Sequence, residues 1–158
     1  SFLGDETAKF KQAQEICTAS EKFVKTMAQR YRIMLLGGGY PVPSPDGRTY
    51  NTAILVNANG EELLRYEKVH LFDVNLPDGN TYQESETVTS GSAIPPVHSS
   101  ERLGQIGISV CYDVRFPELY RQLSKEGAEV LVVPAAFTAF TGKDHWQDLL
   151  QARAIEHP

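Results

Sequence analysis

The segment around which the rest of the chain can be placed reads Gly104-Gln-Ile-Gly-Ile-Ser-Val-Cys-Tyr-Asp-Val-Arg-Phe-Pro-Glu-Leu-Tyr120. Ile106 to Val110 predicts a buried strand, because short apolar runs bounded by turn residues are typical of sheet interiors. The strand delivers Cys111 to a polar turn. Pro117 to Lys125 then predicts a helix, since proline is favoured at the first helical position.

The residues that follow repeat this pattern. Ala128 to Val133 is a second continuous apolar run, and Asp144 to Glu156 predicts a final amphipathic helix. Apolar strands that alternate with helices indicate an α/β fold with parallel strands covered by helices. Ligands bind beyond the carboxyl ends of such strands, where both Cys111 and Phe137-Thr138 fall.

The first third predicts a helix that begins at Ser20, after a short helix within residues 4–16. Arg32 to Leu36 predicts a buried strand that ends at Gly37-Gly-Gly39. These glycines lack the third glycine and the helix start of a dinucleotide-binding loop, so we interpret them as a closely packed strand exit. Pro41 to Gly47 is predicted to be a loop.

A hairpin is predicted in the middle of the chain. Tyr50 to Asn57 and Glu61 to Tyr66 flank Ala58-Asn-Gly60, a strong turn signal. Residues 75–100 are mostly polar, with prolines and glycines, and predict a long functional loop.

Composition indicates an ordinary globular protein. The 158 residues are 41% hydrophobic and 22% charged, and we expect one domain over residues 1–158. The net charge of -5 argues against nucleic acid or an anionic membrane as partner. No secretory signal and no apolar run of bilayer length is visible. Cys17 and Cys111 are expected to be reduced thiols in a cytoplasmic protein, with one disulfide as the alternative.

Cys111 is a candidate nucleophile by position. The following helix N-terminus and Arg115 would both favour thiolate over thiol. The alternative is a small buried hydrophobic residue, and position alone leaves the two interpretations about even. The four histidines match neither a cysteine-protease context nor a zinc pattern. Taken alone, Lys68 is a solvated lysine at a strand end and Glu84 an ordinary loop acid.

Together these segments resemble the nitrilase superfamily of carbon–nitrogen hydrolases over essentially the whole chain. Their order matches, and Lys68 precedes Cys111 by 43 residues. The matching segments are Tyr66-Glu-Lys68-Val-His-Leu-Phe-Asp73, Gln83-Glu-Ser85, Gly107-Ile-Ser-Val-Cys-Tyr-Asp-Val-Arg-Phe-Pro-Glu118, Pro134-Ala-Ala-Phe137, Thr141-Gly142, His145-Trp146 and Ala152-Arg-Ala-Ile-Glu156.

The resemblance implies a four-layer α-β-β-α sandwich, incomplete here at both ends, with a Glu–Lys–Cys triad. Cys111 would attack an amide carbonyl and form a thioester. Lys68 and the backbone N–H of Tyr112 would stabilise the oxyanion. Glu84 would be the additional acid that holds Lys68 and the substrate.

The triad glutamate itself would act as the base, and in the family it precedes a segment like Ser1-Phe-Leu-Gly-Asp5. Glu6 follows that segment and is not assigned the role. We therefore expect the chain to be an internal piece of a longer enzyme, inactive by itself.

Within the superfamily, Arg115-Phe-Pro-Glu-Leu-Tyr120 and Pro134-Ala-Ala-Phe-Thr138 look most like the deaminated-glutathione amidase branch. Tyr112, Arg115, Phe137 and Thr138 would then contact a small carboxylate-bearing amide. An omega-amidase acting on alpha-keto acid amides is the first alternative. A nitrile hydrolase and a binding relative without activity are the others.

The resemblance implies no metal and no organic cofactor. The expected partners are the amide substrate and a second subunit, with neither nucleic acid nor membrane. Subunits would pair through the helices at residues 117–125 and 144–156, although both helices could equally be buried within one subunit.

Overall fold

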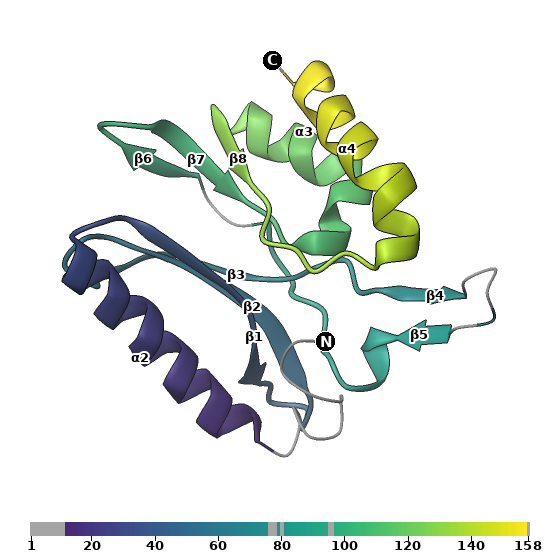
Figure 1. Cartoon of the computed structure of the whole chain (residues 1–158), viewed down its shortest axis with the longest axis horizontal. Helices are drawn as coiled ribbons and strands as arrows, with labels where there is room; N and C mark the ends of the chain where they lie inside the picture. The colour runs from purple at the N-terminus through teal and green to yellow at the C-terminus, as the bar shows by residue number, and fades with distance from the viewer. Residues whose placement is uncertain (1–11, 76–78, 80, 95–96, 158) are drawn as a thin grey trace. The chain divides into compact units, whose positions relative to one another are not determined.

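The computed structural model describes residues 12–75, 79, 81–94 and 97–157 (Figure 1). Glu6 and most of the short helix expected within residues 4–16 lie outside these ranges. The chain divides into two compact units, residues 1–92 and 93–158, and each is described by itself.

The first unit packs one helix on an antiparallel three-stranded sheet of order β1-β2-β3 (Figure 1). The predicted hairpin is confirmed, because β2 pairs with β3 in antiparallel register. Buried side chains of the helix and of the two leading strands form the core between them. The elements are α2 (Ala13–Tyr31), β1 (Leu35–Pro43), β2 (Thr49–Val56) and β3 (Glu62–Glu67).

Two boundaries predicted for this unit are wrong. Helix α2 does not begin at Ser20, because the apolar stripe continues back through the buried Cys17 and Ala13. Strand β1 does not end at Leu36 but runs through the three glycines to Pro43, within the expected loop. Gly37 is needed inside the strand because a Cβ there would overlap the Val24 side chain of the packed helix.

The polar stretch from residue 75 holds more regular structure than predicted. In the first unit, β4 (Asp73–Asn75) and β5 (Thr81–Gln83) form an antiparallel pair. A single 3₁₀ turn, η1 (Glu84–Glu86), follows directly. Local hydrophobic alternation is too weak in three-residue strands to predict them from sequence.

The second unit confirms the parallel pairing. Strand β7 pairs in parallel with β8 and antiparallel with β6, and α3 and α4 lie on the same side of the sheet (Figure 1). Helix α3 has the predicted bounds. The elements of the second unit are β6 (His98–Ser100), β7 (Gly104–Ile108), η2 (Cys111–Arg115), α3 (Pro117–Lys125), β8 (Val130–Val132) and α4 (Ala139–Glu156).

The last helix begins five residues before the predicted Asp144. Thr138 is its N-cap, and the Thr138 Oγ1 accepts the backbone N–H of Thr141 at 3.4 Å. The sequence predicted Thr138 only as a substrate-contacting residue and not as the N-cap of this helix. In the described part of the chain, no helix combines the length and apolar character that spanning a bilayer requires.

Candidate active site

The candidate residues of the first unit form an ion pair between Lys68 and Glu84. The Lys68 Nζ lies 2.5 Å from Glu84 Oε2, and Lys68 is only 2% exposed. A buried cation is tolerated when a carboxylate neutralises it and further hydrogen bonds hold that carboxylate. This contact agrees with the neighbours that the family resemblance implies, although the two residues are 16 apart in the chain.

Two further donors fix the Glu84 carboxylate. The backbone N–H of Phe72 donates to Oε2 at 2.7 Å, and Asn51 Nδ2 donates to Oε1 at 3.0 Å. Each carboxylate oxygen therefore has a protein donor, and the orientation of the group is set before any ligand binds. Sequence reasoning missed both donors. The available signal was Asn51, a polar residue of low β propensity within a predicted strand.

The backbone of Lys68 is held equally closely. Its N–H donates to the carbonyl of Asn51 at 2.9 Å, and its carbonyl accepts the N–H of Gly91 at 2.9 Å. A Cβ at Gly91 would overlap the carbonyl of Glu67. Only glycine fits there, so the approach of this segment contributes to the placement of Lys68.

The candidate residue of the second unit is Cys111, at the first position of η2. Its backbone has φ of 49°, a left-handed conformation that is uncommon outside glycine. The Cys111 N–H donates to the carbonyl of Pro134 at 2.9 Å, which ties the strained residue to the segment after β8. Residues held in such conformations cluster at active sites. The side chain is half-buried and is not joined to Cys17 in a disulfide.

A buried carboxylate supports the turn that follows the cysteine. Asp113 is fully buried, and its Oδ2 accepts the N–H of Val110 at 2.8 Å. A 2.7 Å hydrogen bond between the hydroxyls of Ser109 and Tyr120 attaches helix α3 to the segment that precedes Cys111. Burial raises the pKa of Tyr120, so the hydroxyl stays protonated across the neutral range. These contacts fix both sides of Cys111.

Arg115 lies against two of the other predicted substrate-binding residues. Its guanidinium lies 5.4 Å from the ring centroid of Phe137 and 5.8 Å from that of Tyr112. One guanidinium nitrogen is 3.1 Å from Nδ1 of His145. Because guanidinium can only donate, that Nδ1 accepts, and neutral His145 carries its proton on Nε2.

Beside Phe137 is an open hollow of about 280 Å³ in the second unit. Phe137 and Trp146 form one wall with ring centroids 4.8 Å apart. Lys143 contributes a cation to the lining, a residue that the sequence did not single out. The lining residues are Ala135, Phe137, Thr138, Ala139, Gly142, Lys143 and Trp146.

Each unit holds a group that acyl-transfer chemistry uses. In the second unit, the thiol of Cys111 at the start of η2 could attack a carbonyl. In the first unit, a lysine fixed by a carboxylate could stabilise negative charge. Within the ranges that the structure describes, the His, Cys, Asp and Glu side chains form no group of three placed to hold a metal ion.

Comparison with known proteins agrees with the resemblance noted in the sequence. The Carbon-nitrogen hydrolase family matches residues 2–157. The chain is 64% identical over 159 residues to the deaminated glutathione amidase of Synechocystis sp., covering 99% of this chain and 58% of that protein. It is 34% identical to omega-amidase NIT3 of Saccharomyces cerevisiae, covering 96% of this chain and 53% of that protein.

A solved relative has the same fold. This is a variant amidase from Nesterenkonia sp. AN1 whose active-site cysteine carries the product of Michael addition of acrylamide. It superposes with a TM-score of 0.79 at 31% identity, over 99% of this chain and 57% of that one. The chain thus spans between half and three-fifths of the length of these relatives. The nitrilase-like fold predicted from the motifs is confirmed, and the chain belongs to the carbon–nitrogen hydrolase family.

Proposed function

We propose that the full-length protein hydrolyses the amide bond of a small carboxylate-bearing amide and releases ammonia, as a deaminated-glutathione amidase does. The observation that carries the proposal is the buried Lys68, held on Glu84 by a 2.5 Å ion pair. A lysine so fixed cannot serve as a solvated surface charge, and its use is to stabilise negative charge. The 64% identity to a deaminated glutathione amidase supports the substrate class.

In the proposed reaction, residues 1–158 belong to one domain, and Cys111 and Lys68 act on the same amide group. The Cys111 thiolate forms a bond to the amide carbon, and the carbonyl π electrons move to oxygen. Lys68 Nζ and the N–H of Tyr112 stabilise that oxyanion. Collapse expels ammonia and leaves a thioester, which water hydrolyses to the carboxylate and free thiol. The proton transfers belong to the triad glutamate that the family resemblance requires.

The hollow beside Phe137 is the proposed substrate subsite. Phe137 and Thr138 would line it, and Arg115 would hold the Phe137 ring in place. Lys143 supplies the charge that a substrate carboxylate needs. The hollow therefore suits an anionic amide better than a neutral one.

The test measures ammonia release by the full-length protein from deaminated glutathione, from alpha-ketoglutaramate and from a simple nitrile. We expect the first substrate to have the highest kcat/KM and Cys111→Ala to abolish turnover. Thioester formation is expected as a mass increase on Cys111. Turnover that survives Cys111→Ala would contradict the mechanism. Faster turnover of alpha-ketoglutaramate would favour the omega-amidase alternative, which the 34% identity to the yeast enzyme supports.

We also propose a cytoplasmic location and a homodimer. Cys17 and Cys111 are not joined in a disulfide, which supports a reducing compartment. Ile155 on α4 is 77% exposed, an apolar side chain on one of the two helices through which pairing is expected.

A further inference from the structure

Glu84 lies in a turn that is too short to fix the direction of the Glu84 side chain by its own hydrogen bonds. The 3₁₀ turn η1 has three residues, and no side chain caps its start. The local hydrogen bonds run from the N–H groups of Thr87 and Val88 to the Glu84 carbonyl, at 3.2 and 2.9 Å. The direction of the Glu84 side chain therefore depends on what holds residues 85–89.

Residues 85–89 are bonded to the turn that begins β2. The Thr49 N–H donates to the Thr87 carbonyl at 3.0 Å, and the Thr89 N–H donates back to the Thr49 carbonyl at 2.7 Å. Two residues further along β2, Asn51 reaches the Glu84 carboxylate. The β2 strand thus contacts both the carboxylate and the segment behind it.

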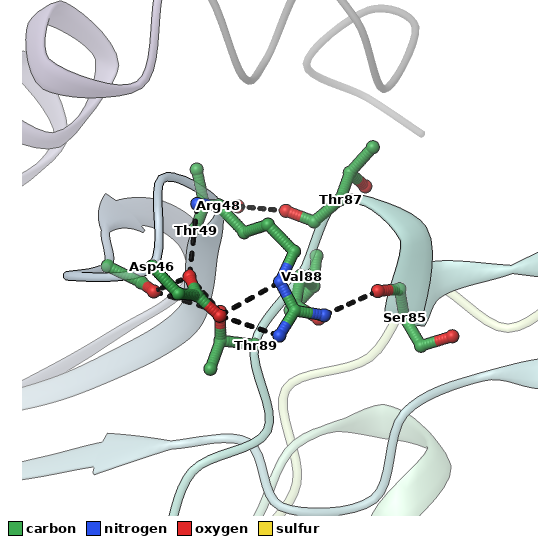
Figure 2. A network of polar contacts seen from close by, with 8 residues as sticks. Asp46, Arg48, Thr49, Ser85, Thr87, Val88 and Thr89 are labelled. Carbon is green, nitrogen blue, oxygen red and sulfur yellow. Dashed lines mark hydrogen bonds and ion pairs between the residues drawn. The ribbon is translucent and has the colours of Figure 1, made fainter.

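Arg48 reinforces this connection at two further points (Figure 2). Its Nη1 donates to the carbonyl of Ser85 at 2.7 Å and to that of Val88 at 3.3 Å. These carbonyls lie near the two ends of the segment, and Ser85 is the residue next to Glu84. One guanidinium therefore bonds to both ends of the segment that follows Glu84.

Asp46 locks the guanidinium in place from the opposite side (Figure 2). Its Oδ2 accepts from Arg48 Nη2 at 2.6 Å and from Nε at 3.0 Å. Ser44 and Thr89 also donate to this carboxylate, the latter at 2.8 Å. A planar group with fixed donors can satisfy a carboxylate and two carbonyls together, whereas an ammonium cannot do so in one geometry.

We propose that Arg48 is a positioning residue for the amide hydrolysis, because its guanidinium fixes residues 85–89 and thereby keeps the Glu84 carboxylate on Lys68. This inference rests on the proposed function. Arg48 acts only through Glu84, so its removal slows the chemical step and leaves substrate binding nearly intact. The network lies at the surface, with Asp46 exposed and Arg48 half-exposed, so the core is not disturbed by substitution.

The test is a double-mutant cycle in the full-length protein, with Arg48→Met and Glu84→Gln singly and together. The readouts are the single-turnover acylation of Cys111, followed by intact-protein mass spectrometry, and the steady-state kcat and KM. Arg48→Met is expected to slow acylation by about tenfold or more, because misplacing a catalytic group by ~1 Å can cost 10²-fold. KM should change less than about threefold. In the Glu84→Gln background, Arg48→Met should change acylation by less than about twofold, since residues acting in series are non-additive.

Two controls separate positioning from stability. Arg102→Met removes an exposed arginine from the turn between β6 and β7 and should leave both readouts unchanged. Arg48→Lys retains the positive charge but lacks the planar set of guanidinium donors. It should recover less than half of the acylation rate that Arg48→Met loses.

An equal effect of Arg48→Met in both backgrounds, no effect at all, or full rescue by lysine would each overturn the inference. Failure of the unsubstituted protein to acylate or to release ammonia would instead overturn the proposed function.

Discussion

At the scale of single residues, Lys68 is the most constrained side chain of the candidate site. We expect Lys68→Met to lower kcat/KM of the full-length protein by about 10²–10³, as removal of an oxyanion donor does elsewhere. It should also destabilise the fold by about 3–5 kcal/mol, because Glu84 loses its cation while still partly buried. Steady-state kinetics and urea denaturation check the two effects.

The matched control is Lys22→Met, which removes an exposed lysine of α2. It should change neither quantity. Near-normal turnover in Lys68→Met would contradict the assigned role.

Lys143 allows a separate residue-scale prediction about substrate choice. A charge-assisted hydrogen bond contributes about 1.5–3 kcal/mol, so Lys143→Met should raise KM for an anionic amide about tenfold or more. KM for a neutral amide of similar size should stay the same. The comparison of the two KM values is the measurement, and an equal rise for both would remove Lys143 from carboxylate recognition.

At the scale of elements, two glycines predict opposite responses to the same change. Gly91→Ala places a Cβ on the Glu67 carbonyl, so the segments must separate and the free energy of unfolding should fall by about 1–3 kcal/mol. Gly142→Ala lies within α4, where the new Cβ would meet Phe137 at an ordinary 3.5 Å. That change should raise the free energy of unfolding by about 0.5–1 kcal/mol, because alanine favours helix.

Denaturant titrations of both variants give the answer. Activity of Gly91→Ala should fall as well, since the Gly91 N–H bonds to the Lys68 carbonyl. If Gly91→Ala changed neither the free energy of unfolding nor the activity, the backbone at Lys68 would have room to move.

The boundaries of elements were the weaker part of what could be predicted from the sequence. The hairpin and α3 were correct because turn residues and a helix-opening proline act locally. The start of α2 was wrong because its apolar stripe continues back through Cys17 and Ala13. The end of β1 was wrong because the contact of Val24 with Gly37 joins two elements. Local pattern cannot register that contact. Gly37, one of the glycines that suggested a strand end, is the residue that lets the helix approach the strand.

At the scale of the whole molecule, the shifted acids predict how stability depends on pH. A hydrogen bond from the Ser85 N–H lowers the pKa of Asp73, and hydrogen bonds from Ser44, Arg48 and Thr89 lower the pKa of Asp46. Burial alone would raise the pKa of Glu21, but the hydrogen bond and charge of Arg65 outweigh it and lower it.

The pKa values of these carboxyls are lower in the folded state than in the unfolded state. Their contribution to the free energy of unfolding is therefore present above the ordinary pKa values of 3.8 and 4.5 and is lost as the pH falls. Burial raises the pKa of Tyr40, whose contribution is lost as the pH rises above its ordinary value of 10.0. Urea midpoints should therefore be flat from about pH 5 to about pH 9 and fall on both sides. Asp73→Asn should flatten the acid side. A midpoint that rises on acidification would contradict this assignment.

Assembly provides the second prediction at this scale. Ile155→Glu places a charge at the proposed pairing helix and should convert the dimer to monomer in analytical ultracentrifugation. Phe23→Glu introduces the same charge on α2, where Phe23 is 62% exposed, and should leave the dimer intact. Dimers that persist in Ile155→Glu would exclude pairing through α4.

The sequence by itself determined the α/β pattern, the cysteine at a strand end and the family, because periodicity, turn chemistry and motif spacing are properties of the chain alone. Only the tertiary structure revealed the donors that hold Glu84 and the left-handed backbone of Cys111. Asn51 and Glu84 are 33 residues apart, and their hydrogen bond depends on how the segments pack together. Such contacts are set by the register between distant segments, so no local pattern contains them.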